Sequence, residues 1–369
     1  MSQRLIESLR TRKNYLVMCL TPILIKNQSR YYSGRIDSHK EFHDTTSQFI
    51  YVPCGHCAEC FKKKQLYIVQ RTQLEALDSY LFFCTLTYQD SMIPYLDIGD
   101  FRHFYPDFHD FQTMIKRCRK DDRWNVSKYL VVSEYGGKRH RPHFHVVFFV
   151  KKSEFDNIFT PINYQSNLFS LVLENWSRNL GSRKFPKYVP LCQYVRRGKY
   201  STFDLHYVDP CTSKHGLMDV AFYVSKYCLK FDDWSESKRK ALYLNLSPEE
   251  YRSYWNLFKP RIRSSHGFGL SDVSSKYLRK CIDEFSNNSD FPMFRNPLNG
   301  QLSPMSPYLF NKVGTLLDKE RFYLYTKDPD SSFDSFHYSD IDYDVYQSKC
   351  DKFDLISSQI VDTDVYDFL

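Results

Sequence analysis

Two β-type runs joined by a glycine turn restrict the fold of this 369-residue chain more than any other feature. The runs, 128–134 and 143–150, are rich in β-branched and aromatic side chains, and Gly136-Gly137 stands between them. This combination is typical of a β-hairpin. A third β-type run, 81–88, precedes the pair. Three strand candidates in succession, with helical segments between and after them, point to an α+β domain built on an antiparallel sheet.

Four segments have the spacing of apolar residues that is typical of a helix. They are 61–80, 107–123, a stretch within 164–180 that ends at Gly181, and 217–231. The intervening segment 182–215 is polar, basic and turn-rich, which predicts loops. We therefore expect an α+β sandwich in which helices pack across a central antiparallel sheet.

Composition divides the chain into three regions. Residues 1–60 form a basic segment with a cysteine cluster, and residues 61–285 contain the strand and helix patterns. Residues 286–369 are rich in Pro, Asn, Ser and Asp, which predicts a loop-rich region followed by a poorly ordered acidic tail.

The net charge of +8 conceals a strong asymmetry along the chain. Residues 328–369 contain eleven Asp and two Lys, a net charge of −9, so the preceding 327 residues carry +17. A basic body favours a polyanionic partner, because binding phosphates releases counterions. Basic charge alone suits an RNA-binding or ribosome-associated protein equally well.

Cysteine usage and hydropathy restrict the compartment. The eleven cysteines are an odd number, and the N-terminus lacks the charged, apolar and small-residue sequence of a secretory signal. Both features favour a reducing compartment. The sequence has no apolar run of the eighteen residues that a membrane-spanning helix needs, so we expect no membrane association.

A histidine pair opens the last β-type run. In His143-Phe144-His145 the two imidazoles are at i and i+2, and such residues point to the same face of a strand. Glu134 ends the preceding run, so across the turn its carboxylate can reach the same face as a third ligand. A lone His-x-His is more often a coincidental half-buried pair. The combination with Glu134 and the turn favours a divalent metal site.

A tyrosine-lysine motif lies in the last predicted helix. Tyr223 and Tyr227 are at i and i+4, on one helical face, and each is followed three residues later by a lysine, Lys226 or Lys230. A phenol has a pKa near 10, so as a nucleophile it needs an activated electrophile or a cation that stabilises the phenolate. A metal ion at the histidine pair would supply the first, and the lysines the second. Packing of two tyrosines on a sheet is the alternative.

The N-terminal cysteines have metal-ligand spacing. Cys54, Cys57 and Cys60 form a C-x2-C-x2-C pattern with His56 inside it, but a second C-x-x-C pair is absent from the sequence. A structural Zn²⁺ would need a fourth ligand, for which Cys19 is our candidate. Free thiols at a turn are an equal alternative, and an iron–sulfur cluster is a weaker third one.

Together these motifs resemble the HUH endonucleases, which are named for two histidines separated by a bulky hydrophobic residue. The resembling segments, in the order of the family's motifs, are 82–88, 141–145 and 223–230. The doubled tyrosine is similar to the branch that performs two successive strand transfers. Residues 53–60 and 133–136 resemble the replication initiators of microviruses, especially gokushoviruses, and the resemblance covers roughly residues 16–270.

The resemblance implies rolling-circle DNA replication in the cytoplasm of a bacterial host. One tyrosine would nick the viral origin, leaving a 5′-phosphotyrosine and a free 3′-OH, and the other would later release the displaced strand as a circle. It implies Mg²⁺ or Mn²⁺ held by Glu134, His143 and His145. The implied substrates are single-stranded and supercoiled double-stranded DNA, and a host replicative helicase and polymerase are candidate partners.

Two other functions stay open at this point. A relaxase or transposase of the same catalytic type differs in substrate and partner domains. A non-catalytic, zinc-containing nucleic-acid-binding protein would use the basic charge and the cysteines without the tyrosine chemistry.

Overall fold

The computed structural model describes most of the chain between residues 58 and 318. The described residues are 23–26, 49–52, 58–98, 101–136, 140–194, 202–209, 220–221, 223–224, 242, 246–286, 292–315 and 317–318. They form two compact units, one from residues between 71 and 269 and one from residues up to 70 and from 270 onward. The predicted acidic tail lies outside the described residues.

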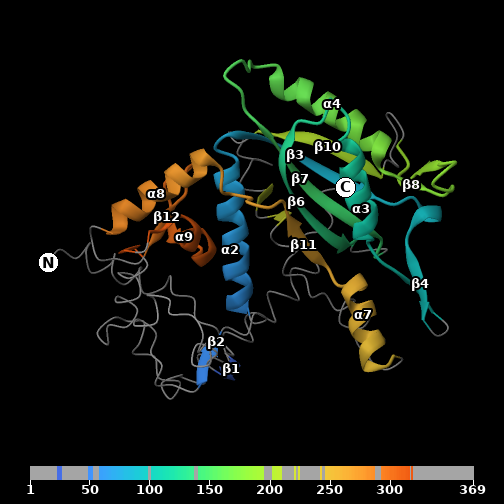
Figure 1. The fold of residues 1–369 in the computed structure, drawn as a ribbon, viewed down its shortest axis with the longest axis horizontal. Coiled ribbons are helices and arrows are strands. Elements are labelled where there is room, and N and C mark those ends of the chain that lie inside the picture. Colours follow the sequence, from blue (N-terminus) through green and yellow to red (C-terminus); the bar gives the residue numbers. More distant parts are fainter. Residues whose placement is uncertain are drawn as a thin grey trace. The chain divides into compact units, whose positions relative to one another are not determined.

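A five-stranded antiparallel sheet is the centre of the larger unit (Figure 1). Its strand order is β10-β3-β7-β6-β11. The bounds are β3 Ser79–Thr87, β6 Val126–Tyr135, β7 Pro142–Lys151, β10 Phe203–Val208 and β11 Arg261–Ser264. The predicted α+β fold with a central antiparallel sheet is therefore confirmed.

Strand register gives the sheet two different faces. Glu134 of β6 pairs with His143 of β7, and Thr85 of β3 pairs with His145. Because successive side chains alternate, the histidines share one face and Phe144 points to the other. The Phe144 face carries the main apolar core, with residues from all three central strands.

Helices α3 and α4 cover the Phe144 face (Figure 1). Helix α3, Phe108–Cys118, begins at Asp107, whose carboxylate accepts a hydrogen bond from the backbone N of His109 at 2.8 Å. Such an N-cap satisfies one of the free backbone donors of the first turn. Helix α4 spans Thr160–Asn175, and both helices bury their apolar stripes against the strands.

Short hairpins and a further helix complete the larger unit. The hairpins are β4 Tyr95–Ile98 with β5 Phe101–Phe104, and β8 Ser177–Asn179 with β9 Tyr188–Pro190. The 3₁₀ helix η3 spans Asp90–Met92, and helix α7 spans Pro248–Phe258. Ser247 and Glu250 form a capping box at the start of α7, because each side chain accepts the backbone N–H of the other residue.

The smaller unit contains the remaining elements. They are β1 Ile23–Lys26, β2 Phe49–Val52, α8 Asp272–Ser286, β12 Met293–Arg295, β13 Leu302–Pro304 and α9 Pro307–Val313, together with most of α2, Ala58–Glu75. Gln70 of α2 ties the helix to this unit. Its amide donates to the carbonyl of Pro304 at 2.7 Å and accepts from the backbone N of Ser306 at 3.0 Å.

Three sequence-based predictions of elements differ from the structure. The helix predicted to reach Gly181 ends at Asn175, and the next residues form β8. The segment 182–215, predicted as loops, contains β9 and β10. The region after residue 286 contains β12, β13 and α9 in addition to loops. The three predicted regions of the chain stay a prediction.

No helix in the described ranges is both long and apolar enough to cross a lipid bilayer.

Candidate metal centre

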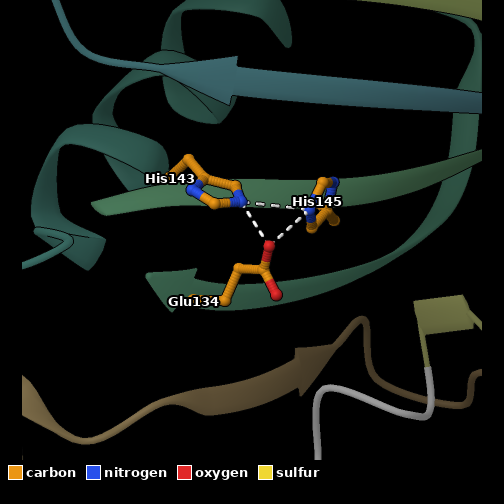
Figure 2. A group of neighbouring side chains, drawn as sticks. All are labelled: Glu134, His143 and His145. Carbon is orange, nitrogen blue, oxygen red and sulfur yellow. Dashed lines mark hydrogen bonds and ion pairs between the residues drawn. The ribbon is translucent and has the colours of Figure 1, made fainter. Parts of the chain in front are cut away.

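Three potential ligands meet where the β6–β7 hairpin closes (Figure 2). Oε1 of Glu134 lies 3.0 Å from Nε2 of His145 and also contacts Nε2 of His143. The two Nε2 atoms are 3.2 Å apart. The three residues are the metal-ligand cluster found among the described residues. The same-face geometry that period-two alternation predicts for the two histidines and Glu134 is present.

Each imidazole is oriented by its other nitrogen. Nδ1 of His143 lies 3.0 Å from the carbonyl oxygen of Arg141, and Nδ1 of His145 lies 3.3 Å from Oγ1 of Thr85. A carbonyl only accepts, so the proton of His143 is assigned to Nδ1, which leaves a lone pair on Nε2. A threonine hydroxyl can accept in the same way. Metal-bound histidines are usually held by such a second hydrogen bond.

Glu134 provides a buried negative charge. Its side chain is 7% exposed. Burial by itself raises its pKa, but His143 and His145 beside it lower the pKa to about 2, so the carboxylate is ionised at neutral pH. Its second oxygen, Oε2, is buried and has no hydrogen-bond partner among the described residues. An unpartnered buried oxygen is costly, so the site favours a bound cation.

The donor set fits a divalent metal ion. With both Nε2 lone pairs aimed at one carboxylate oxygen, three acceptors converge on the same space. Such an arrangement needs protons or a cation between the ligands. Two imidazole nitrogens and one carboxylate match the ligand preferences of divalent transition metals. Glu134, His143 and His145 would supply three ligands and leave further positions for water or substrate.

Tyr223 lies beside the ligand cluster. Its ring centroid is 5.3 Å from that of His145, with the planes at 74°, and 5.7 Å from that of Phe83. Phe83 itself stacks on His145 at 5.4 Å. Tyr223 is half-buried and in helical conformation. The structure therefore brings the first tyrosine of the predicted motif into ring contact with a predicted metal ligand.

A second polar pair lies close to the cluster and was missed in the sequence. Asp204 and His206 of β10 are joined by a 3.2 Å ion pair, and the His206 ring lies 5.6 Å from Phe83. The hydrogen bond from His206 lowers the pKa of Asp204. Their i, i+2 spacing is the same signal that identified the histidine pair, but it lay in a segment predicted to be loops.

The other predicted site residues are not brought to this cluster by the described structure. Tyr227, Lys226, Lys230, Cys19, Cys54 and Cys57 lie outside the described residues. Cys60 is described, at the start of α2 in the smaller unit, and it is buried. The zinc site predicted at the cysteine cluster therefore stays a prediction.

Comparison with known proteins places the cluster in a family context. Residues 81–232 match a family described as replication-associated protein of the ORF2 type. The chain is 31% identical to the Replication-associated protein ORF2 of Spiroplasma virus 4 over 147 residues, 36% of this chain and 44% of that protein. It is 25% identical to the Replication-associated protein ORF4 of Chlamydia phage 1 over 283 residues, 72% of this chain and 63% of that protein.

The chain is a relative of viral replication-associated proteins. The predicted resemblance to microvirus replication proteins is thus confirmed. The matched parts span less than two thirds of the length of either viral replication-associated protein. The family segment contains β3, β6 and β7, so the ligand cluster and Tyr223 both lie inside it. No solved structure matches the chain.

Proposed function

We propose that the chain is a rolling-circle replication initiator, which nicks one DNA strand at the origin by tyrosine attack and later rejoins the displaced strand as a circle. One observation carries the proposal. Tyr223 is in ring contact with His145, a member of a buried Glu-His-His cluster, inside the segment that matches the replication-associated family. A nucleophile beside a metal site is the arrangement that phosphoryl transfer needs.

The ligand cluster would hold Mg²⁺ or Mn²⁺. A divalent ion bound there polarises the scissile phosphate and so makes the phosphorus more electrophilic. Glu134, His143 and His145 keep their ligand atoms within 4.8 Å of one another, and the bonds from the Nδ1 atoms fix the two rings. The site is therefore preorganised before DNA binds.

Tyr223 would be one nucleophile and Tyr227 the other. The phenolic oxygen forms an ester bond to phosphorus and loses its proton, while the 3′ oxygen leaves and gains one, which gives a 5′-phosphotyrosine and a free 3′-OH. One phosphodiester bond replaces another, so the strand is resealed without an external energy source. Lys226 and Lys230 would stabilise the phenolates by their charge. Two tyrosines one turn apart allow two successive transfers on one chain.

The proposed partners follow from this activity. The substrates are the viral origin in single-stranded and in supercoiled double-stranded DNA, and the protein would act in the cytoplasm of the bacterial host beside its replicative helicase and polymerase. Zn²⁺ at Cys19, Cys54, Cys57 and Cys60 is proposed from spacing alone.

A nicking assay on supercoiled DNA with added Mn²⁺ tests the proposal. We expect His143→Ala and His145→Ala each to reduce nicking by about 100-fold or more, because each removes one of three ligands and leaves the strand intact. His109→Ala, on the exposed side of α3, is the matched control and should nick at nearly the wild-type rate.

Full Mn²⁺-dependent nicking by either ligand variant would reject the metal site. If wild-type protein binds DNA but does not nick it with any divalent metal, the non-catalytic nucleic-acid-binding function is correct instead. Nicking that is lost in both ligand variants and kept in His109→Ala supports the initiator.

A further inference from the structure

The β8–β9 hairpin exposes large apolar side chains. Leu180 is 57% exposed, Phe185 78% and Tyr188 55%. The hairpin projects beyond the end of α4 (Figure 1). Single apolar residues on a surface are ordinary, but three within nine residues of one hairpin form a patch, and such patches mark interaction sites.

The same hairpin is strongly basic. Residues 177–190 contain Arg178, Arg183, Lys184 and Lys187 and no acidic residue. Arg178 is neutralised by Asp110 in an ion pair of 2.5 Å. No ion pair joins the other three cations to an acidic residue within the described part of the chain. Their charges therefore face solvent together with the exposed rings.

The exposed loop is held in one shape by hydrogen bonds. The side-chain oxygen of Asn179 accepts the backbone N–H of Gly181 at 2.9 Å and that of Lys187 at 2.8 Å. Ser182 accepts the backbone N–H of Phe185 at 3.0 Å. A Cβ at Gly181 would overlap the carbonyl oxygen of Phe185, so the close approach requires glycine. The loop thus presents the Phe185 ring to solvent in a preorganised way, which lowers the entropy cost of binding.

A basic hollow lies beside the hairpin. A cavity of about 370 Å³ is lined by Arg117, Lys120, Ser177 and Tyr188, with Glu174 and Asn175. The Arg117 guanidinium lies over the Tyr188 ring at 4.8 Å. Glu174, the acidic residue of the lining, is paired with Arg123 at 2.7 Å. The hollow therefore favours an anionic group next to an aromatic ring.

The hairpin is anchored at the end of the sheet that carries the ligand cluster. Gln89 donates its backbone N–H to the carbonyl of Leu191 at 2.6 Å and its side-chain amide to that of Pro190 at 2.7 Å. Gln89 follows Thr87 by two residues, and Thr87 pairs with His143. The base of the hairpin therefore lies a few residues from the metal ligands.

We propose that the β8–β9 hairpin is a docking site for single-stranded DNA. Phe185 and Tyr188 stack on bases, while Arg183, Lys184 and Lys187 contact phosphates. Rings interleaved with cations recognise single strands, because only unpaired bases offer their faces for stacking. The proposal rests on the proposed function insofar as the strand held here is the one presented to the cluster at Glu134.

The test is metal-free binding of a fluorescent oligonucleotide by the full-length protein, measured by anisotropy. Without a divalent metal no cleavage interferes. Phe185→Ala should raise the Kd for a single strand about fivefold or more, which corresponds to the loss of one base stack. Phe155→Ala is the matched control, because Phe155 is 93% exposed but precedes α4, at the opposite end of that helix. It should leave the Kd unchanged.

The phosphate contacts are tested by salt dependence. Replacing Arg183 and Lys184 together by Gln should reduce the slope of log K against log salt by about 1.4, since each single-strand phosphate contact contributes about 0.7. The pair Lys151→Gln and Lys152→Gln removes two cations that follow β7 and should reduce the slope less.

The outcomes separate the docking site from the nuclease. Equal Kd values for Phe185→Ala and Phe155→Ala overturn the docking site, whether or not the wild-type protein nicks DNA. An equal loss of affinity for single strands and for blunt duplex overturns it too, because stacking on bases needs unpaired ones. A selective single-strand defect in Phe185→Ala supports it even if the nicking assay fails.

Discussion

The two imidazoles of the ligand cluster are held by different kinds of acceptor. His143 uses the backbone carbonyl of Arg141, which no side-chain substitution removes, whereas His145 uses the hydroxyl of Thr85. His145 is therefore the ligand whose orientation can be changed without changing the ligand. Thr85 also lies on β3, so the ligand on β7 depends on a side chain of the neighbouring strand.

Thr85→Val should weaken Mn²⁺ binding about tenfold, because the Nδ1 atom of His145 loses its partner while the β-branched shape is kept. Isothermal titration of the full-length protein with Mn²⁺ measures it. Thr85→Ser, which keeps the hydroxyl, is the control and should bind nearly as well as the wild type. Wild-type affinity in Thr85→Val would show that the 3.3 Å contact does not orient the ring.

The tyrosines can be separated by removing one hydroxyl at a time. Tyr223→Phe and Tyr227→Phe should each lose part of the nicking and resealing cycle, and only the double variant should lose all covalent attachment to DNA, because either phenol can attack. Phe keeps the ring contacts of Tyr223 with Phe83 and His145, so packing is preserved. Mass spectrometry of the DNA-linked peptide decides the assignment, and attachment outside residues 223–227 would contradict it.

At the scale of elements, the strands that sequence predicts are those with long, nearly continuous apolar runs. β3, β6 and β7 were predicted within two residues of their bounds, since both faces of the three central strands are covered. β10 and β11 were missed. Both are edge strands; β10 alternates apolar residues with Asp204 and His206, and β11 has four residues with two arginines. Short polar edge strands carry little local signal.

The same distinction applies to the candidate site. The geometry of Glu134, His143 and His145 could be predicted because one hairpin contains all three, and period-two alternation with a short turn fixes their faces. Thr85 and the pair at Asp204 and His206 could not. Their approach depends on pairing between strands far apart in sequence, and that register is set by the packed sheet.

The end of α4 was misplaced because Gly181 resembles a helix stop. The helix ends earlier, at Asn175, whose carbonyl accepts a hydrogen bond from the guanidinium of Arg117 on α3. A tertiary contact thus provides the cap, and Gly181 serves the hairpin turn instead.

A buried ion pair joins α3 to the β8–β9 hairpin. Asp110 of α3 is 5% exposed, and its carboxylate accepts from Arg178 of β8 and from the hydroxyl of the fully buried Tyr88 at 3.2 Å. Removing the carboxylate leaves a half-buried guanidinium and a buried hydroxyl with a lost partner. Such losses typically cost about 3 kcal/mol or more.

We therefore expect Asp110→Ala to lower the free energy of unfolding by about 3 kcal/mol, measured by urea denaturation. The matched control is Asp97→Ala, which removes an ion pair with Arg102 whose side chains are 63% and 55% exposed. This surface pair should contribute less than about 1 kcal/mol. Equal effects in the two variants would show that the Asp110 contact is not a stabilising link.

At the scale of the whole molecule, charge is divided between a body of +17 and a segment, 328–369, of −9. The acidic segment also contains aromatic residues, at Phe333, Phe336, Tyr338, Tyr343, Tyr346 and Phe353. A solvated extension without function is the ordinary interpretation of such a composition. Its carboxylates and rings nevertheless have the same chemistry as the phosphates and bases of a single strand, and the basic body would bind either.

Removing residues 328–369 should therefore strengthen non-specific single-strand binding and steepen its dependence on salt. The cationic positions that the acidic segment competes for become available to phosphates, and each additional phosphate contact releases counterions. Binding isotherms at several salt concentrations, for the full-length and the truncated protein, measure both effects. A shorter truncation after residue 353 removes four of the eleven aspartates and should give a smaller change in the same direction. If affinity and slope are the same in all three proteins, the acidic segment does not compete with DNA, and the +17 body alone determines the salt dependence.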